Sequence, residues 1–180
     1  MNAIAILPAR GGSKRIPQKN IRLFCGKPII SYSIETALES KLFDQVLVST
    51  DDEEIATVSR QYGATVDELR PPEFSDDVTG VLDVVSYEIR QLANRNYYPS
   101  DICLIYATAP MLRTVDLKQS YEVFKTSDVD FVFSAAEFGS PIFRTFTILD
   151  DGRAKMFQPQ HYHANSQDLP RAFHDAAQFC

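Results

Sequence analysis

The sequence predicts an α/β protein with a mostly parallel sheet covered by helices. Two apolar runs, Ala3–Leu7 and Gln45–Ser49, have the continuous hydrophobicity of strands that are buried on both faces. Helical spacing of apolar residues follows each run, and this strand–helix alternation is typical of parallel sheets with crossover helices. A hairpin signal near the C-terminus, Asp150-Asp151-Gly152, indicates an antiparallel addition.

The first two strands each lead into a helix. Pro28 suits the first position of a helix, where its missing N–H is not needed. Apolar residues then recur at helical spacing: Ile30, Ile34, Ala37 and Leu38. After the second strand, Asp51 and Glu54 form a capping pair for a helix that runs through Tyr62 and ends at Gly63.

The middle of the chain begins with a proline-broken polar loop, Leu69–Asp77. A third helix follows, with its apolar residues on one stripe: Val78, Val81, Leu82, Val85, Ile89 and Leu92. Ile102–Tyr106 is a further apolar strand, closed by the segment ATAP. Thr114 caps a fourth helix. That helix turns three side chains inward: Leu117, Tyr121 and Phe124.

The last third of the chain reads as strands. Asp130–Ala135 has strand composition, and Ile142–Leu149 and Arg153–Phe157 flank the hairpin signal. Because no internal repeat, low-complexity tract or linker separates the elements, the sequence predicts a single domain over residues 1–180.

Composition argues against several classes of protein. A net charge of −6 does not suit a general nucleic-acid binder or an anionic-membrane binder. No stretch approaches the roughly 20 apolar residues of a membrane span, and the N-terminus lacks a signal-peptide pattern. Three scattered cysteines, Cys25, Cys103 and Cys180, are not spaced as metal ligands. We therefore expect a cytoplasmic protein that binds neither nucleic acid nor membranes.

The segment LPARGGSKRIPQKN, residues 7–20, concentrates positive charge directly after the first strand. It contains four of the chain's 18 Lys and Arg: Arg10, Lys14, Arg15 and Lys19. Open α/β sheets bind ligands at this end of their strands, and Gly11 and Gly12 let backbone N–H groups approach an anion. The segment matches neither the Walker A nor the G-x-G-x-x-G motif. It indicates a polyphosphate site, with a solvated basic turn as the alternative.

Several motifs occur in the order of a known family. LPARGGSKRIPQKNI, GKPIISYSIETAL and VSTDDEEIA resemble the acylneuraminate cytidylyltransferases, which make CMP-sialic acids. SQDLPRAFHDAAQF, residues 166–179, is similar to the branch that activates pseudaminic acid for bacterial surface or flagellin glycosylation. The resemblance implies a three-layer α/β/α Rossmann-like nucleotide-diphospho-sugar transferase fold, mostly parallel with an antiparallel addition.

The resemblance also implies a reaction. The anomeric hydroxyl of a nine-carbon keto acid attacks the α-phosphate of CTP and expels pyrophosphate, with Mg²⁺ as cofactor. Members of the family continue past the point where this chain stops, with acidic residues for magnesium and part of a dimer contact. We therefore expect the chain to be truncated at its C-terminus, and the full-length protein to be a homodimer.

The implied site falls into two groups. Residues expected to bind the nucleotide are Ala9, Arg10, Gly11, Gly12, Ser13, Lys14, Lys19, Asn20, Arg70, Asp76 and Thr79. Among them, Arg10 and Lys19 are the expected catalytic residues, and Arg70 matches the position near the cytosine. Residues expected to contact the sugar are Tyr106, Thr108, Pro110, Gln167, Asp168, Phe173 and His174.

The chain departs from the family pattern at three positions. Arg15 stands where related enzymes have glycine and is expected to be solvated. Tyr106 stands where many have Gln, and Asn165 stands where the pseudaminic branch leads us to expect a basic residue. N-acetylneuraminic, legionaminic and octulosonic acids therefore stay open as substrates, as does a nucleotide-binding module without turnover. No metal ligands are assigned, because His161 and His163 lack a third partner.

Overall fold

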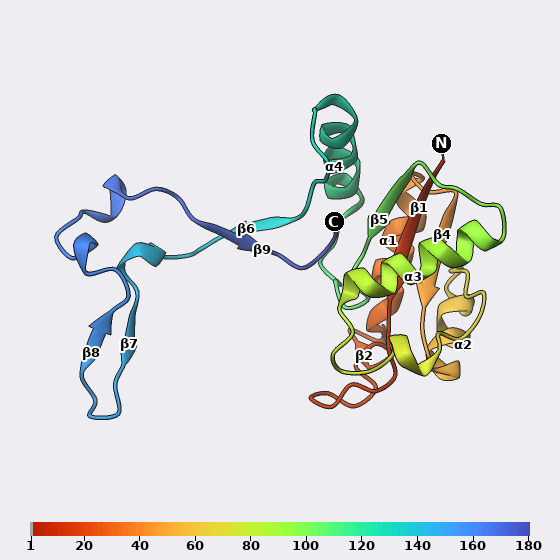
Figure 1. Cartoon of the computed structure of the whole chain (residues 1–180), viewed down its shortest axis with the longest axis horizontal. Helices are drawn as coiled ribbons and strands as arrows, with labels where there is room; N and C mark the ends of the chain where they lie inside the picture. Colours follow the sequence, from red (N-terminus) through yellow and green to blue (C-terminus); the bar gives the residue numbers. More distant parts are fainter. Residues whose placement is uncertain (1) are drawn as a thin grey trace. The chain divides into compact units, whose positions relative to one another are not determined.

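The computed structural model describes residues 2–180, and internal contacts divide the chain into two compact units (Figure 1). The first comprises the chain up to Phe133 together with Ala177–Cys180, and the second comprises Ser134–Ala176. Within residues 2–180, no helix is both long enough and apolar enough to cross a membrane. The single domain predicted over residues 1–180 stays a prediction.

The first unit is built on a three-stranded parallel sheet in the order β4-β1-β5. The central strand β1 (Ala3–Pro8) pairs with β4 (Gln45–Ser49) on one side and with β5 (Asp101–Leu104) on the other. The first five side chains of β1 are buried, which confirms the strand predicted from its continuous apolar run. The predicted third strand ends earlier than expected, and Ile105 continues only as an isolated bridge to Phe179.

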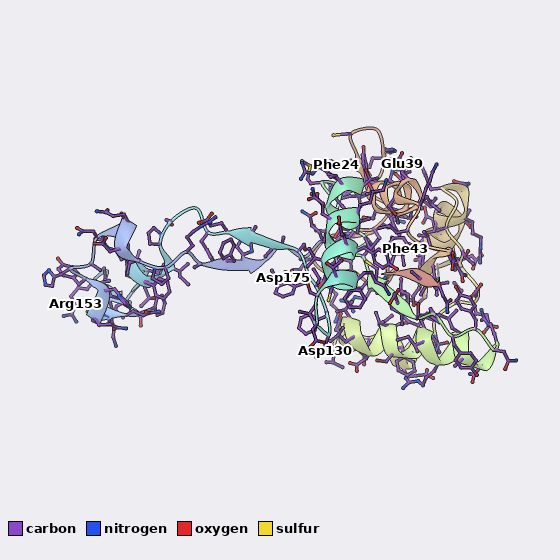
Figure 2. The ribbon with its side chains drawn as sticks, turned by 90° about the horizontal axis from the view of Figure 1, so that it is seen from above. Phe24, Glu39, Phe43, Asp130, Arg153 and Asp175 are labelled. Atoms are coloured by element: carbon purple, nitrogen blue, oxygen red, sulfur yellow. The ribbon has the colours of Figure 1, made fainter. Side chains whose placement is uncertain are left out.

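Helices cover both faces of this sheet, so it forms the middle of three layers. The helices are α1 (Ile29–Ser40), α2 (Glu53–Gln61), α3 (Val81–Asn94) and α4 (Thr114–Thr126). Ala5 and Leu7 on β1 face a core made with α1, α2 and α4, whereas Ile4 and Ile6 face α3. Figure 2 shows α3 on one side of the sheet and α1 on the other. The predicted α/β/α layering is therefore confirmed.

The remaining elements are short. In the first unit, β2 (Leu23–Phe24) pairs antiparallel with β3 (Lys27–Pro28), and a 3₁₀ turn spans Pro72–Phe74. In the second unit, β6 (Ala135–Glu137) pairs antiparallel with β9 (Phe173–Asp175). The hairpin and 3₁₀ elements of that unit are β7 (Phe146–Ile148), β8 (Ala154–Met156), η2 (Ile142–Arg144), η3 (Pro159–His161) and η4 (Ser166–Asp168).

The antiparallel addition is confirmed by β7 and β8, which pair around the predicted turn. Gly152 in that turn has a φ of 80°, a left-handed conformation that glycine adopts without steric cost. The strand predicted over Asp130–Ala135 is wrong in position. Pairing with β9 begins only at Ala135, and Phe131 and Phe133 are exposed.

The predicted starts of α1, α2 and α4 are each displaced by one residue. Pro28 lies in β3 and precedes α1, and Arg113 rather than Thr114 stands before α4. At α2, the cap is Asp52 and not Asp51. Its Oδ1 accepts hydrogen bonds from the N–H groups of Glu54 at 2.9 Å and of Ile55 at 3.0 Å. Composition favoured either aspartate, and the backbone geometry selects the second.

The buried face of α3 also differs from the predicted stripe. The buried residues are Val84, Val85, Glu88 and Leu92. Val78 precedes the helix and is 87% exposed, and Leu82 is 67% exposed. The apolar pattern alone did not predict the buried face of α3, because one of the buried residues, Glu88, is a carboxylate. The partners of Glu88 lie on β4, far from it in sequence.

Candidate functional site

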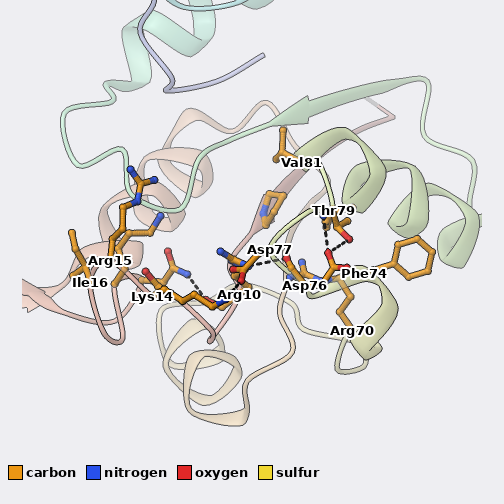
Figure 3. A pocket seen from close by; sticks show the side chains of 15 residues that line it. Arg10, Lys14, Arg15, Ile16, Arg70, Phe74, Asp76, Asp77, Thr79 and Val81 are labelled. Atoms are coloured by element: carbon orange, nitrogen blue, oxygen red, sulfur yellow. Dashed lines mark hydrogen bonds and ion pairs between the residues drawn. The ribbon is translucent and has the colours of Figure 1, made fainter.

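A cavity of about 630 Å³ opens beside the carboxyl end of β1, in the first unit (Figure 3). Its size lies within the usual range for small-molecule sites. It is lined by Pro8, Arg10, Ser13, Lys14, Arg15, Ile16, Lys19, Asn20, Arg70, Phe74, Asp76, Asp77, Thr79, Val81 and Val84. Two segments supply most of this lining: the basic loop after β1 and the polar loop that precedes α3. The cavity thus lies at the end of the sheet where the sequence predicted a ligand site.

The basic loop is fixed to the sheet through its backbone. The N–H of Ala9 donates to the carbonyl of Ser49 at 2.8 Å, which extends the pairing of β1 with β4 by one residue. Asn20 is buried, and its Nδ2 donates to the carbonyl of Arg10 at 2.9 Å. These bonds hold the start and the end of the loop, so its cations project from a fixed backbone.

Gly11 lies directly against the start of α2. Its N–H donates to Asp51 Oδ1 at 2.8 Å. A Cβ at position 11 would lie 2.5 Å from Oδ2 and 2.8 Å from Cβ of Asp52, closer than atoms can approach. The neighbouring Gly12 has nothing within 4 Å of the corresponding point. The first glycine of the pair is therefore required by packing, and the second is not.

Two cations of the loop converge on one carboxylate, Asp77 (Figure 3). Arg10 Nη1 lies 2.7 Å from Asp77 Oδ1, and it also donates to the carbonyl of Asp76 at 2.7 Å. Lys14 Nζ pairs with the other oxygen of the same carboxylate. Hydrogen bonds from Lys14 and then Arg10 lower the pKa of Asp77 below its usual value. The arrangement shows that Arg10 and Lys14 can grip one anion together.

Asp76, the neighbour of Asp77, is turned back into its own loop. Its Oδ1 accepts from the hydroxyl of Thr79 at 2.6 Å and from the N–H groups of Thr79 and Val78 at 2.7 and 3.1 Å. The hydroxyl bond of Thr79 is the main reason that the pKa of Asp76 is lowered. Both predicted residues line the cavity, and here they shape its wall by bonding to each other.

Arg70 lines the cavity and is only 4% exposed. Its Nη1 donates to the carbonyl and to the hydroxyl of Ser49, at 3.0 and 3.1 Å, and its Nε donates to Ser75 Oγ at 3.2 Å. Burial lowers the pKa of this guanidinium, because desolvation disfavours the charged form. The hydroxyl of Ser49 in turn donates to Glu88 Oε1 at 2.5 Å. Arg70 is thus held by the protein itself in one orientation.

The cavity gathers most of the predicted nucleotide residues. Arg10, Ser13, Lys14, Lys19, Asn20, Arg70, Asp76 and Thr79 line it, and Ala9, Gly11 and Gly12 belong to the same loop. Seven lining residues were not among those predicted: Pro8, Arg15, Ile16, Phe74, Asp77, Val81 and Val84. Arg15 was expected to be solvated only, and it is exposed and also lies on the cavity wall. Asp77 stands one residue after the predicted Asp76, so the acidic pair itself was the available signal.

The predicted sugar residues lie in two places. Tyr106, Thr108 and Pro110 follow β5 in the first unit and are half-buried. Gln167, Asp168, Phe173 and His174 belong to the second unit and are exposed. Their contribution to a common sugar site stays a prediction. Within the described residues 2–180, no three His, Cys, Asp or Glu side chains are grouped so as to hold a metal ion.

Comparison with known proteins agrees with this geometry. A family model described as "Cytidylyltransferase" matches residues 4–168. A pseudaminic acid cytidylyltransferase of Campylobacter jejuni is 48% identical over 179 residues, which cover 99% of this chain and 77% of that protein. The CMP-N,N'-diacetyllegionaminic acid synthase of Legionella pneumophila is 35% identical over 127 residues, 71% of this chain and 55% of that protein.

Among solved structures, CMP:2-keto-3-deoxy-manno-octonic acid synthetase complexed with CTP has a similar fold. The TM-score is 0.69 at 19% identity, covering 98% of this chain and 72% of that one. The predicted fold class is confirmed by this likeness.

The two glycines of the basic loop give a matched test of the packing. Gly11→Ala should lower the free energy of unfolding by about 1–3 kcal/mol, the usual cost of overpacking, because its Cβ would collide with Asp52. Gly12→Ala should stay within about 0.5 kcal/mol of the parent protein, as expected where no contact changes. Urea unfolding followed by circular dichroism measures both. Equal stabilities of the two variants would contradict the close approach of Gly11 to Asp52.

Proposed function

The chain belongs to the cytidylyltransferase family, and we propose that it transfers CMP from CTP to the anomeric hydroxyl of pseudaminic acid, releasing pyrophosphate. The single observation that carries the proposal is the near-full-length likeness to a pseudaminic acid cytidylyltransferase. The cationic cavity beside β1 supports it independently, because a nucleoside triphosphate needs such a site. The product would serve bacterial surface or flagellin glycosylation.

In the proposed complex, the triphosphate takes the place of Asp77 on Arg10 and Lys14. Arg10 can offer two parallel N–H groups to phosphate oxygens, while Lys14 and Lys19 act as point charges. Phosphoryl transfer depends mainly on positioning and on stabilising negative charge. Arg10 and Lys19 are the proposed catalytic residues, since charge accumulates on the pyrophosphate as it leaves.

The nucleobase would lie toward Arg70, Phe74 and Thr79, on the side of the cavity away from the basic loop's cations. Arg70 offers a fixed donor, and the loop before α3 offers backbone groups to the edge of the base. A site built from such fixed polar groups rejects a ligand that leaves them unpaired. This is the proposed basis for choosing CTP over UTP.

Because of the family resemblance, the proposal also includes Mg²⁺ as the cofactor and a homodimer as the assembly. Mg²⁺ usually keeps several waters and binds through one or two carboxylates together with substrate phosphates. Asp76 is already bonded to Thr79, and Asp77 to Arg10 and Lys14, so the ion would arrive with CTP and be held chiefly by its phosphates and by water. When bound, this ion would neutralise phosphate charge.

For the homodimer, the support is a set of exposed apolar side chains on the second unit. They are Phe138, Phe146, Ile148, Phe157, Tyr162 and Phe173. Aromatic side chains are enriched in protein interfaces, and a second copy of the chain is the proposed partner.

Nucleotide and sugar choice test the proposal directly. Pyrophosphate release should be faster with CTP than with UTP, ATP or GTP, and faster with pseudaminic acid than with N-acetylneuraminic, legionaminic or octulosonic acid. The assay measures initial rates over this panel in the presence of magnesium. Preference for another acid sugar would overturn the pseudaminic assignment and leave the family in place. CTP binding without turnover on any sugar would favour a nucleotide-binding module.

Charge removal in the basic loop tests the catalytic assignment. Arg10→Ala and Lys19→Ala should each lower turnover about tenfold to a hundredfold, as expected when a hydrogen bond to a charged transition state is lost. Arg22→Ala removes an exposed cation just beyond the loop and should change turnover little. Circular dichroism checks the fold of all three. Near-normal turnover of both Arg10→Ala and Lys19→Ala would refute the phosphate assignment.

Asp77 should compete with the nucleotide. Asp77→Asn removes the carboxylate that Arg10 and Lys14 share, so CTP affinity should rise by up to about fivefold, a small effect because exposed ion pairs contribute little. Asp128→Asn, an exposed acid beyond α4, controls for net charge and should have no effect. Calorimetric titration with CTP measures all three proteins. Weaker binding by Asp77→Asn would show that Asp77 helps to hold the nucleotide instead.

A further inference from the structure

Glu88 is a buried carboxylate outside the cavity described above. It lies on the sheet-facing side of α3, between Val84 and Leu92, and is 8% exposed. Burial raises the pKa of this group, because desolvation penalises its charge. An apolar residue at this position would complete the core without that penalty, so the carboxylate calls for another explanation.

The explanation lies in the hydrogen bonds of Ser49. A serine hydroxyl has one proton to donate and two lone pairs to accept with. Ser49 Oγ donates its proton to Glu88 Oε1 at 2.5 Å and accepts from Arg70 Nη1 at 3.1 Å. Glu88 therefore fixes the direction of the hydroxyl and leaves its lone pairs for Arg70. Linked bonds of this kind polarise and strengthen one another.

Arg70 depends on this arrangement because its guanidinium is itself buried. Its Nη1 is held by Ser49 and its Nε by Ser75, so two sides of the group are fixed while it lines the cavity. Desolvation lowers the pKa of Arg70, and the negative charges of Asp51 and then of Glu88 oppose this shift by favouring its charged form. The chain from Glu88 through Ser49 to Arg70 thus joins α3, β4 and the cavity wall.

We propose that Glu88 is a positioning residue for nucleobase selection, which holds Arg70 through Ser49 in the orientation that favours cytosine over uracil. This inference rests on the proposed function, which supplies CTP as the ligand. Glu88 itself touches neither nucleotide nor sugar, so its role is to orient another residue. A purely structural role would affect stability alone, whereas the positioning role affects nucleotide preference.

Glu88→Gln separates these two roles. The amide keeps the shape of the side chain, but it replaces a carboxylate, which only accepts, by a group with N–H donors that can bond Ser49 Oγ and occupy the lone pair used by Arg70. Stability should change little or increase, because a buried charge is relieved. CTP should bind about tenfold more weakly, which corresponds to about 1.4 kcal/mol, and the preference for CTP over UTP should narrow. The KM for CTP should rise while the KM for the sugar acid stays unchanged.

The experiment is calorimetric titration of CTP and of UTP, with magnesium and without sugar, on four proteins. They are the parent protein, Glu88→Gln, Ser49→Ala and the control Glu122→Gln, which removes an exposed charge on α4. We expect Glu88→Gln and Ser49→Ala to lose CTP preference to a similar degree and the control to keep it. A fifth protein, the double variant that carries both Glu88→Gln and Ser49→Ala, should be no worse than the poorer single variant, because both changes act through the same bonds.

The possible outcomes distinguish a failure of the positioning role of Glu88 from a failure of the proposed function. A parent protein that prefers CTP, together with a Glu88→Gln variant of the same preference, overturns the role of Glu88 and leaves the proposed function standing. A parent protein that binds CTP and UTP equally overturns the cytosine assignment itself, and the positioning role falls with it. Because Glu88→Gln is read out on its own, the result does not depend on whether Ser49→Ala folds.

Discussion

The hydrogen bonds of Ser49 join the parts of the molecule on which the site depends. Its carbonyl accepts from the N–H of Ala9 at 2.8 Å and from Arg70 at 3.0 Å, which uses both of its lone pairs. Its hydroxyl links Arg70 to Glu88 on α3. The last residue of β4 therefore fixes the start of the basic loop, the buried arginine and the helix on one face of the sheet. The basic loop and Arg70 keep fixed relative positions because one residue anchors both.

The parts of the fold that could be predicted are those determined by local pattern. Ala3–Leu7 and Gln45–Ser49 read as buried strands because both faces of the sheet are covered, and the structure places β1 and β4 there. The hairpin around Gly152 could be predicted because glycine after aspartate accepts the left-handed conformation that such a turn requires. The buried face of α3 was not visible. Glu88 is polar by itself and becomes a core residue only through a partner 39 positions away.

The candidate site, like the fold, could be predicted only where a local sequence pattern determines it. The basic loop was predictable, because charge density, glycines and a strand end coincide in one segment. Which of two adjacent aspartates faces that loop was not. Asp76 folds back onto Thr79, and Asp77 reaches Arg10 and Lys14. The two residues are chemically identical, so only the backbone path of the loop distinguishes them, and that path depends on contacts between segments remote in sequence.

Because Gly11 lies against Asp52, the residues that positions 11 and 52 can accept depend on each other. The carboxylate of Asp52 both caps α2 and fills the space that a side chain at position 11 would need. A larger residue at position 11 becomes accessible only after Asp52 has been replaced by glycine, which has no Cβ to collide with and is also accepted at helix N-caps. In a combinatorial library the two sites should therefore show sign epistasis, and lineages should change position 52 first. The sequence of the basic loop is in this way constrained by the capping of a neighbouring helix.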